Sequence, residues 1–469
     1  MGTQGRNILL FGLFLMLSAR SAAGHSNVNV APPNGNDDTA NVQTALNECV
    51  AQGPGCTVQL QTGKYFTKQL VTYNFHGTLK GMGIGNTIIE ALRPLPVNIP
   101  DVSQGECIPN TTTCLWPTLI MFVEGNICVS DLSIRITAPP GTATTGWSFA
   151  GMEFTDLIDA LRFMGRYPTS ATVDRISIEG LPDNSPTSSG FNLINGVIFP
   201  GEFPRSTAPF DYYFLSGSLT VRNSSFKSMD DGVAAGAFLT SSHITIGGSP
   251  SSGNSFENLY AGMDMESAEK SDFEISYNVS SGIIAGMWVI PWISSVFIPS
   301  SPSRYLIHDN KFIGTGQNAE GFYFLNEPAH PWIRAAAWNN IVELQDTLSE
   351  GIGAYNTQGT AIWDNSVVGA DGLDAVGLHN TTLSTVVHNN VTGFTADSSV
   401  GNAQIYLDPS TSQDLVVCAE PSDSVLNQGI NNTVIGCRQS VDATRSFPPA
   451  TAVPRLNLFR GKPWVHQSQ

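Results

Sequence analysis

The string Ile307-His308-Asp309-Asn310 decides the fold, because close variants of it return as Ile362-Trp363-Asp364-Asn365 and Val387-His388-Asn389-Asn390. Each string ends in an asparagine that follows a short apolar run. The column of equivalent asparagines comprises Asn223, Asn278, Asn310, Asn340, Asn365 and Asn390. Its spacings are 55, 32, 30, 25 and 25 residues, and the first of them spans two units. A period of this size, filled with short strands and turns, predicts a solenoid of stacked coils.

A second column, made of glycines, gives the orientation of one strand in each coil. It comprises Gly232, Gly262, Gly286, Gly321, Gly351 and Gly372. The residues one and three places after each of these glycines are all apolar. Because side chains alternate along a strand, those positions are predicted to face the core, and the positions two and four places after the glycine to face outward. We expect Met263, Met287, Phe322 and Ile352 to stack as one interior column.

The two columns predict a parallel β-helix. Asparagine suits a repeated turn because it tolerates left-handed backbone, and its amide can hydrogen-bond the same asparagine one coil away. A β-propeller would need even blades of about 40 residues, and a β-sandwich would show no fixed column. We expect one all-β, single-stranded parallel β-helix domain over residues 25–437, followed by an irregular tail over 438–469.

The N-terminal stretch resembles a known family. Gly35-Asn-Asp-Asp-Thr39 leads into a helical pattern over residues 40–51, and Gly55-Cys-Thr-Val-Gln-Leu60 and Leu79-Lys-Gly-Met-Gly83 follow it. This order is similar to the N-terminal cap and first coils of the pectin-lyase-like proteins (the pectate lyase superfamily). The resemblance implies a right-handed parallel β-helix, a short N-terminal capping helix and, as in many members, activity on polysaccharides.

The catalytic signatures of that family are largely missing. Met229-Asp230-Asp231-Gly232 resembles the D-D-C motif of the polygalacturonases, but their G-H-G and R-I-K motifs do not occur in the chain. The W-x-D-H and R-x-P-x-x-R motifs of the pectate lyases are absent as well. Neither mechanism can therefore be carried over from the resemblance.

The chain is acidic and poor in charge. Its 469 residues hold 22 Lys and Arg against 39 Asp and Glu, which gives a net charge of −17, and only 13% of the residues are charged. Such a chain cannot neutralise the phosphates of a nucleic acid, and its long-range field does not attract a polyuronate. No cofactor or metal is expected, except that Ca²⁺ could bridge a polyuronate to Asp and Glu oxygens. The expected partner is a polysaccharide, bound by a monomer without membrane contact.

Residues 1–24 have the pattern of a secretory signal peptide. Arg6 precedes an apolar run over residues 8–17, and Ser21-Ala22-Ala23-Gly24 supplies small residues for cleavage. No later apolar run is long enough to span a bilayer. We therefore expect a secreted protein, either extracellular or, in a bacterium, periplasmic or on the cell surface. Export permits disulfides, and the candidate pairs are Cys49 with Cys56, Cys107 with Cys114 and Cys418 with Cys437, which leaves Cys128 as a small buried residue.

The outward positions after the glycine column supply the candidate active site. Asp264 and Glu266 are two residues apart, so both are expected to point outward with Cα atoms about 6.5–7 Å apart. Trp288 is expected beside Asp264 one coil on, and Tyr323 one coil further. A carboxyl pair spaced about 5–9.5 Å can act as acid with base or nucleophile on a glycosidic bond, and aromatic rings stack on sugar faces. The alternative is a solvated face without a catalytic role.

Further candidates flank this pair. Asp230, Asp231 and Glu320 lie at the turn into the same strands, although acid–glycine pairs also suit the turn itself. Long aromatic insertions follow several of the strands, and they either build a groove above one face or pack on each other as covers. Their candidate substrate-binding residues are Arg304, His330 and Trp332.

The sequence favours a secreted enzyme that cleaves an extracellular or cell-wall glycan by hydrolysis or β-elimination, as a glycoside hydrolase or a polysaccharide lyase. The alternative is a non-catalytic β-helix that binds glycans or acts as an adhesin-like surface protein. The two differ in what they expect of Asp264, Glu266, Trp288 and Tyr323. An open row of these side chains would favour the enzyme, and their burial would favour the alternative.

Overall fold

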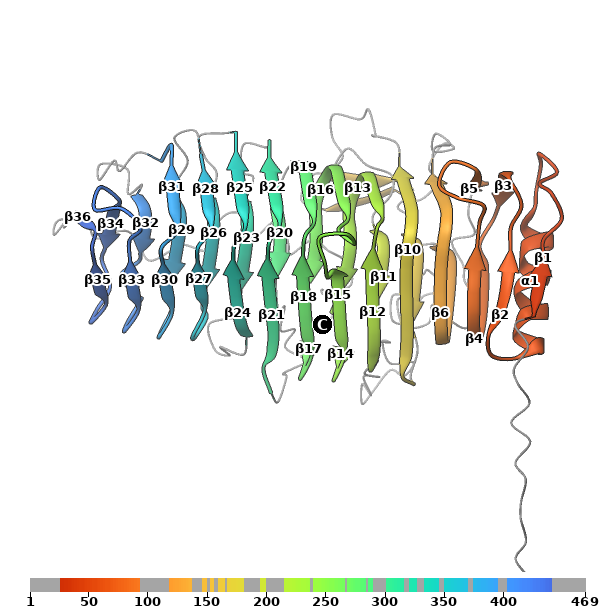
Figure 1. Cartoon of the computed structure of the whole chain (residues 1–469), viewed down its shortest axis with the longest axis horizontal. Coiled ribbons are helices and arrows are strands. Elements are labelled where there is room, and N and C mark those ends of the chain that lie inside the picture. The colour runs from red at the N-terminus through yellow and green to blue at the C-terminus, as the bar shows by residue number, and fades with distance from the viewer. Residues whose placement is uncertain are drawn as a thin grey trace, which may run out of the picture.

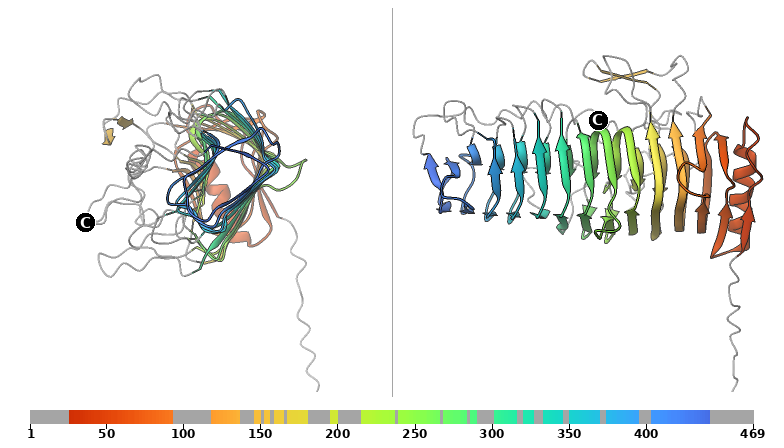
Figure 2. Two further views of the ribbon diagram at one scale, coloured as in Figure 1. Left: turned by 90° about the vertical axis from the view of Figure 1, so that its left-hand side faces the viewer. Right: turned by 45° about the horizontal axis from the view of Figure 1, so that its top comes forward.

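The computed structural model describes residues 26–92, 118–136, 146–149, 152–155, 159–164, 167–180, 195–199, 215–236, 239–265, 268–283, 286–289, 301–315, 320–326, 333–345, 350–369, 374–394 and 403–440. In this part of the chain the strands form a long stack of coils, with the helix α1 (Thr39–Gln52) at its N-terminal end (Figure 1). Viewed along the stack, the coils enclose one common interior (Figure 2). The expected right-handed parallel β-helix with a short capping helix is confirmed. None of the helical segments described here is long and apolar enough to cross a membrane.

Each complete coil contributes one strand to each of three parallel faces. The first face contains β1 (Asn27–Asn29), β2 (Cys56–Gln59), β12 (Gly217–Arg222), β15 (His243–Gly247), β18 (Asp272–Ser276), β21 (Ser303–His308), β24 (Ile333–Trp338), β27 (Ala361–Trp363), β30 (Thr385–Val387), β33 (Leu415–Val417) and β35 (Thr433–Ile435). The second face contains β3 (Gly63–Thr67), β5 (Thr87–Ala91), β19 (Val279–Ile283), β22 (Lys311–Gly314), β25 (Ile341–Leu344), β28 (Ser366–Val368) and β31 (Asn390–Thr392).

The third face carries the candidate site. It contains β9 (Asp159–Met164), β11 (Asn195–Phe199), β20 (Gly286–Val289), β23 (Glu320–Leu325), β26 (Glu350–Tyr355), β29 (Asp374–His379), β32 (Ala403–Leu407), β34 (Ser424–Asn427) and β36 (Arg438–Ser440). Five longer strands bend from one face into the next: β4 (Leu70–Lys80), β6 (Thr118–Ile136), β10 (Thr169–Gly180), β13 (Ser225–Ala235) and β16 (Ser255–Met265). Two small pairs stand apart, the parallel β14 (Leu239–Thr240) with β17 (Ala268–Glu269) and the antiparallel β7 (Gly146–Phe149) with β8 (Met152–Thr155).

A ladder of buried asparagines holds the turn between the first and second faces. In it each side-chain Nδ2 donates to the Oδ1 of the next asparagine at 2.9–3.0 Å, and each backbone N–H donates to the same Oδ1 at 3.0–3.1 Å. Its members are Asn254, Asn278, Asn310, Asn340, Asn365 and Asn389. The predicted hydrogen bonding from coil to coil is therefore confirmed over Asn278 to Asn365.

The predicted asparagine column is wrong at both of its ends. Ser224, and not Asn223, stands at the ladder position, because the Ser224 N–H donates to the Asn254 Oδ1 at 3.0 Å. Asn223 has a φ of 52° and occupies the left-handed position just before the ladder. At the other end Asn390 is already the first residue of β31 and is exposed. The spacing of asparagines alone cannot identify a ladder position that is held by a serine, nor can it choose between the adjacent Asn389 and Asn390.

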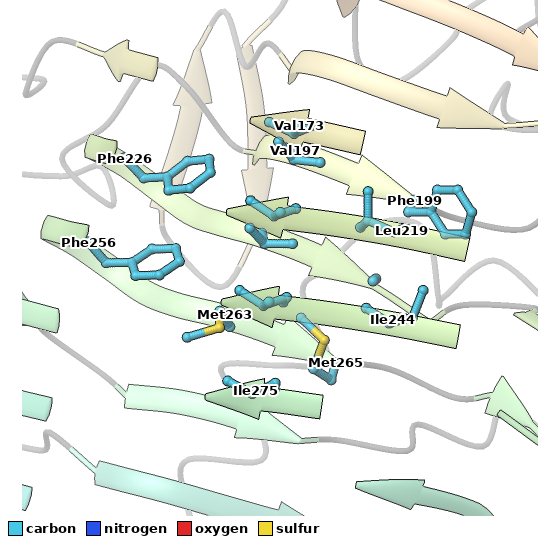
Figure 3. Close-up of a cluster of buried hydrophobic side chains, with 14 of the residues drawn as sticks. Val173, Val197, Phe199, Leu219, Phe226, Ile244, Phe256, Met263, Met265 and Ile275 are labelled. Atoms are coloured by element: carbon cyan, nitrogen blue, oxygen red, sulfur yellow. The ribbon is translucent and has the colours of Figure 1, made fainter. Parts of the chain in front are cut away.

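The interior follows the predicted alternation. Phe322 pairs in register with Met287 on one side and Ile352 on the other, and the side chains of Met263, Phe322 and Ile352 are fully buried. Further toward the N-terminus the rings of Phe226 and Phe256 stack with their centroids 4.9 Å apart (Figure 3). Among the described residues, buried apolar side chains from Val28 to Val425 form one continuous core.

The last glycine of the predicted column is wrong. The register pairs Ile352 with Val376 and Gly353 with Gly377, so Ala375 stands opposite Gly351 in place of Gly372. The segment between Gly351 and its partner in β29 is three residues longer than the predicted partner, Gly372, implied. Spacing between glycines therefore fails where a coil changes length.

The disulfides lie at the two ends of the stack. Cys49–Cys56 joins α1 to β2, and Cys418–Cys437 ties the last coils together, as predicted. The expected pair Cys107 and Cys114 lies outside the described residues. Cys128 is only half-buried and not interior, because it occupies the outward position between the buried Ile127 and Val129.

The interior column gives a first prediction. Phe322→Ala removes a fully buried ring and leaves a cavity between β20 and β26, so the free energy of unfolding should fall by ~3–5 kcal/mol. Urea denaturation followed by far-ultraviolet circular dichroism would measure this change. An unchanged midpoint would contradict the inward orientation of Phe322.

The asparagine ladder gives a second prediction. Asn310→Ala removes the Oδ1 that accepts from both the backbone N–H and the Nδ2 of Asn278, and it removes the Nδ2 that donates to the Asn340 Oδ1. A buried polar group left unsatisfied costs ~1–3 kcal/mol, so the protein should unfold at a lower urea concentration. Asn390→Ala is the matched control, because Asn390 is exposed and outside the ladder, and its effect should stay within about 0.5 kcal/mol. Equal effects of the two substitutions would show that the ladder adds no stability.

Candidate functional site

One row of residues runs along the outward side of the third face, perpendicular to its strands. We call it the outer row, and it comprises Met121, Arg162, Ile198, Ala234, Asp264, Trp288, Tyr323, Gly353, Gly377 and Tyr406, each the register partner of the next. The predicted succession of Asp264, Trp288 and Tyr323 on consecutive coils is therefore what the structure has. The strand that holds Asp264 and the strand that holds Tyr323 are separated by two steps of about 4.8 Å each.

The outer row points away from the interior, but most of its side chains with described burial are buried, and Tyr406 is partly exposed. Asp264 is 2% exposed and Tyr323 is 3% exposed. The expectation that Asp264 belongs to a solvent-facing surface is therefore wrong. Alternation along a strand predicts on which side of the sheet a side chain lies. It does not predict whether that side chain is exposed to solvent.

Several predicted site residues are placed only in part or not at all. Glu266, His330 and Trp332 lie outside the described residues. Asp230 is in β13, Trp288 in β20 and Glu320 at the start of β23. The backbone of each is on the third face or leads into it.

Arg304 is the one predicted residue that lies elsewhere. It is not part of an insertion above the site but belongs to β21 on the first face, where its Nε donates to the Asp272 Oδ1 at 2.9 Å. Both side chains of this pair are about half exposed. The apolar alternation of residues 303–308 would have indicated a strand here.

Asp231 lies beside a charged cluster that the sequence analysis did not find. It is 1% exposed and pairs in register with Asn195, whose Nδ2 donates to the Asp159 Oδ1 at 2.7 Å. The guanidinium of Arg162, itself 1% exposed, forms an ion pair with Asp159. A buried charge pair is costly unless both ions are hydrogen-bonded, so this end of the third face is a fixed polar structure.

A second cluster, on β26 and β29, brings together a carboxylate, a phenol and an imidazole. The Tyr355 hydroxyl donates to the Glu350 Oε2 at 2.5 Å, and the His379 Nε2 lies 3.4 Å from the Glu350 Oε1. Glu350 is 3% exposed, whereas the side chain of His379 is 21% exposed. We call Glu350, Tyr355 and His379 the Glu–Tyr–His cluster. It lies where a ligand on the third face could reach the imidazole.

Two glycines make room for this cluster. A Cβ at Gly353 would lie 2.8 Å from the Glu350 Oε1 and 2.7 Å from a ring carbon of Tyr355. A Cβ at Gly377 would lie 2.7 Å from the His379 Nε2 and would also collide with the Glu350 carboxylate. The outer row therefore has no side chain on β26 and β29, and the carboxylate of Glu350 lies over the bare backbone.

Aromatic rings continue on both sides of the cluster. Tyr323 and Tyr355 have ring centroids 4.5 Å apart, and the rings of Tyr355 and His379 stack at 4.1 Å with an interplanar angle of 6°. Tyr406 follows at 5.4 Å from His379 and donates its hydroxyl to the Gln428 Oε1 at 3.3 Å. The rings thus form a continuous line over four strands.

The charges around His379 favour its protonated form. Burial opposes the positive charge, but the hydrogen bond and charge of Glu350, together with Asp374 and Asp408, outweigh it and raise the pKa of His379. For the phenol of Tyr406, burial and the negative charges of Asp408 and Asp374 all disfavour the anionic form. They raise the pKa of Tyr406, so its phenol stays neutral. The raised pKa of His379 favours a proton on the imidazole, and the raised pKa of Tyr406 favours a proton on its phenol.

Acidic residues begin three consecutive strands of the third face. Glu320 pairs in register with Glu350, and the pairing of Ile352 with Val376 places Asp374 next in the same line. Neighbouring parallel strands lie about 4.8 Å apart, which is the order of spacing that carboxyl pairs have in glycoside hydrolysis. Glu320 was among the predicted catalytic residues, whereas Glu350 and Asp374 were not.

The signal for the missed cluster is present in the sequence. Gly353 and Gly377 interrupt the outward positions of two successive strands, and each is followed two residues later by an aromatic ring, Tyr355 or His379. A glycine inside a strand often marks a place where another group lies close to the backbone. This signal was hidden because the glycine column was out of register at β29.

No group of three or more His, Cys, Asp and Glu side chains placed to hold a metal ion is found among the described residues. The acids that surround His379 are engaged with the imidazole and with backbone and hydroxyl donors, as when the Asp408 Oδ1 accepts from the N–H groups of Asn380 and Ser410 at 3.1 Å and 2.8 Å. These contacts do not provide the set of free oxygens that Ca²⁺ prefers. We therefore derive no step through a metal.

No protein-family model and no curated protein matches the chain. Among solved structures, the A-module of a mannuronan C-5 epimerase from Azotobacter vinelandii is 14% identical with a TM-score of 0.44, and the match covers 89% of this chain and 99% of that one.

Two further solved structures give similar values. The catalytic unit of a thermostable GH87 alpha-1,3-glucanase from Streptomyces thermodiastaticus is 12% identical with a TM-score of 0.47, over 89% of this chain and 69% of that one. A family 28 exopolygalacturonase from Yersinia enterocolitica is 12% identical with a TM-score of 0.39, over 89% and 76% of the two chains. In its fold, the chain is similar to the pectin-lyase-like β-helix proteins that its N-terminal residues resemble.

Proposed function

We propose that this protein is a secreted enzyme that cleaves an extracellular or cell-wall polysaccharide, by hydrolysis or β-elimination, on the outward side of the third face. The observation that supports the proposal is the Glu–Tyr–His cluster, in which Glu350 meets a phenol at 2.5 Å and an imidazole at 3.4 Å over two glycines. Buried carboxylates with such partners, placed in a line of aromatic rings, suit chemistry on a sugar chain.

The cluster supplies the groups that either reaction needs. In hydrolysis, one carboxyl group protonates the leaving oxygen while a second acts as base or nucleophile, and Glu320 and Asp374 flank Glu350 at the spacing of neighbouring strands. In β-elimination, a base removes the proton beside the carboxyl group of an acidic sugar and an acid protonates the leaving oxygen. Glu350 can supply the base, and the protonated His379 or the Tyr355 hydroxyl can supply the acid. The two reactions differ in product, because only elimination leaves a double bond.

The predicted pair of Asp264 and Glu266, with Trp288, forms a second stretch of the same face. Asp264 lies three strands before Glu350, about 14 Å away in the direction of the stack. This separation is too long for the two carboxyl groups to act on one bond. A polysaccharide that runs along the stack would pass both stretches, so we assign the chemistry to the Glu–Tyr–His cluster and binding of the chain to Asp264, Trp288 and Tyr323.

A specific observation favours the alternative function, a non-catalytic β-helix that binds glycans or acts as an adhesin-like surface protein. Asp264 and Tyr323 are almost completely buried, and the sequence analysis expected that outcome for the alternative. A binding protein would retain a glycan from solution without releasing any product, so the activity measurement below separates the two functions.

The first experiment is a panel of neutral, acidic and amino polysaccharides, each with and without Ca²⁺, exposed to the purified protein. New reducing ends without ultraviolet absorbance would indicate hydrolysis, and absorbance from an unsaturated product would indicate elimination. Retention of a glycan without either product would support the binding protein. If no polysaccharide is cleaved or retained, the proposed function is wrong.

The next prediction locates the chemistry. Glu350→Gln keeps the size of the side chain and an acceptor for Tyr355, but it removes the ionisable group, so turnover on the best substrate should fall by ~10²–10⁴. Glu343→Gln is the matched control, because Glu343 is an exposed partner of Lys311 on the second face, and its turnover should not change. Circular dichroism would verify that both variants are folded.

Asp264→Asn separates the two stretches of the third face. If our assignment holds, this variant raises the substrate concentration needed for half-maximal rate more than it lowers turnover. Full activity of Glu350→Gln together with inactive Asp264→Asn would move the chemistry to the stretch around Asp264. Full activity of both variants would rule out the third face as the active site.

The pKa of His379 gives a prediction for stability. Because the folded protein raises this pKa, its contribution is fully present below the ordinary histidine pKa of about 6.5 and is lost as the pH rises through the raised value. The free energy of unfolding of the wild type should therefore decline above pH ~6.5 more steeply than that of His379→Gln. Urea denaturation across a pH series would measure both curves. Parallel curves would show that His379 is not stabilised in its charged form.

A further inference from the structure

The outward side of the first face changes in chemical character along the stack. Up to β18, the outward residues are mostly polar or charged, and they alternate with buried apolar residues. Examples are Thr172 and Asp174 on β10, Thr220 and Arg222 on β12, and Asp272 and Glu274 on β18. From β21 onward, two outward rows of this face are mostly apolar. We call their apolar members the apolar strip, which comprises Leu306, Ala336, Trp338, Ala361, Trp363, Val387, Leu415, Val417 and Ile435.

The apolar strip is at least partly exposed along its whole length. None of its nine residues is buried, and Ile435 in the last coil is 52% exposed. The indole rings of Trp338 and Trp363 stack with their centroids 4.9 Å apart, and the His308 ring stacks on Trp338 at 4.3 Å. A contiguous apolar surface with polar surroundings often marks a place where another segment or molecule binds.

Charged residues stand at the two margins of the apolar strip. Arg304 and Arg334 lie where its strands begin, and Asp309 and Asp364 follow where the strands end. Arg304 and Asp309 have ion-pair partners. Arg334 and Asp364 are both exposed and form no ion pair within the described part of the chain. Asp364 is therefore available to a cation that approaches the margin where the strands end.

The size of the apolar strip decides what can cover it. Its two rows cross six strands, so the strip is about 24 Å long, with about 7 Å between the rows. With its side chains it has an area on the order of 300 Å², whereas a stable dimer buries about 800 Å² on each partner. Two copies of a chain with a net charge of −17 also repel each other. A single extended segment of about seven residues has the length of the strip, so one segment of chain fits it better than a second copy.

A segment with the right composition follows the last coil. Residues 441–469 lie outside the described residues, and they follow directly after β36, which shares the last coil with Ile435. They include the run Val453-Pro-Arg-Leu-Asn-Leu-Phe-Arg460, in which Leu456, Leu458 and Phe459 stand between two arginines. Residues 441–452 can span up to about 40 Å, which is more than the length of the strip. The 29 residues from 441 to 469 contain four cations against one acid, in a chain that is acidic as a whole.

We propose that residues 453–460 of this chain cover the apolar strip, with Leu456, Leu458 and Phe459 against the strip and an arginine of the run paired with Asp364. Apolar surface of the segment and of the strip is then removed from water together. Because both belong to one chain, the contact does not incur the loss of translational freedom that a separate partner would. The strip is on the first face, so this inference goes beyond the proposed function and does not depend on it.

The first experiment compares the full-length wild type with Leu456→Ser/Leu458→Ser/Phe459→Ser by hydroxyl-radical footprinting and mass spectrometry. If the segment covers the strip, Trp338 and Trp363 should be oxidised about threefold faster or more in the variant. The substituted residues lie outside the β-helix, so the coils that carry the strip should remain folded.

This experiment has internal and external controls. Met82 and Tyr167 are 52% and 67% exposed near the N-terminal end of the stack, and they should be oxidised at equal rates in wild type and variant. Asn457→Ser changes the same run without removing an apolar side chain, so it should leave the oxidation of both tryptophans unchanged.

The second experiment changes the strip itself. Leu415→Gln places a polar group in the strip, so the segment should be released, and trypsin should cleave the folded protein after Arg455 and Arg460 about threefold faster or more. Val368→Gln makes a similar change at a residue of the second face that is 39% exposed, and it should leave the cleavage unchanged. Circular dichroism would verify that both variants are folded.

The outcomes test both the segment and the surface. Equal oxidation of Trp338 and Trp363 in wild type and in the triple variant would overturn the inference, as would the same cleavage rate in Leu415→Gln and Val368→Gln. If sedimentation shows an oligomer that Leu415→Gln dissociates and the triple variant does not, a second copy covers the strip and the inference is wrong. Neither readout involves a polysaccharide, so a negative result leaves the proposed function unaffected.

Discussion

The hydrogen bonds between consecutive coils are the constraint on which the rest of the structure depends. Each strand is held in register with its equivalent one coil on, and the asparagine ladder fixes the same register again at a corner through both the backbone and the side chain. Because every ladder amide is buried, a slip of one residue would leave several polar groups unsatisfied at once. Register in turn determines which side chains become neighbours along the outer row, including those of the candidate site.

The repeat made much of this predictable. The asparagine period and the apolar alternation after the glycines identified the coils, the inward residues such as Phe322, and the succession of Asp264, Trp288 and Tyr323. These are properties of a single strand or of one repeated turn, and a sequence contains them directly. The disulfides at Cys49–Cys56 and Cys418–Cys437 were predictable for the same reason, since each joins residues that are close in the chain.

The errors have a common physical origin in the lengths of the coils. Insertions can lie at a corner without disturbing the hydrogen bonds of the strands, so neither Gly372 nor the ends of the asparagine column could be placed by counting residues. The Glu–Tyr–His cluster was missed because its contacts join β26 to β29 across such a change in length. Burial could not be predicted from the pattern either. The outward direction of Asp264 follows from alternation, whereas its burial does not.

The asparagine ladder and the line of rings have one property in common. In both, a side chain contacts the equivalent residue of an adjacent coil, as Asn310 does with Asn340 and Tyr355 with His379. Such contacts are absent from any isolated coil. The candidate site is thus a product of stacking, and its geometry is inherited from the spacing of the backbone strands.

The positions of the two observed disulfides have a consequence for how the stack comes apart. An inner coil has neighbours on both sides, whereas a terminal coil has one, so a linear stack loses order most easily by fraying from its ends. Cys49–Cys56 and Cys418–Cys437 cross-link those terminal segments. Reducing agents should therefore expose the ends to proteases first and shorten the molecule inward, and the inner coils should be digested last.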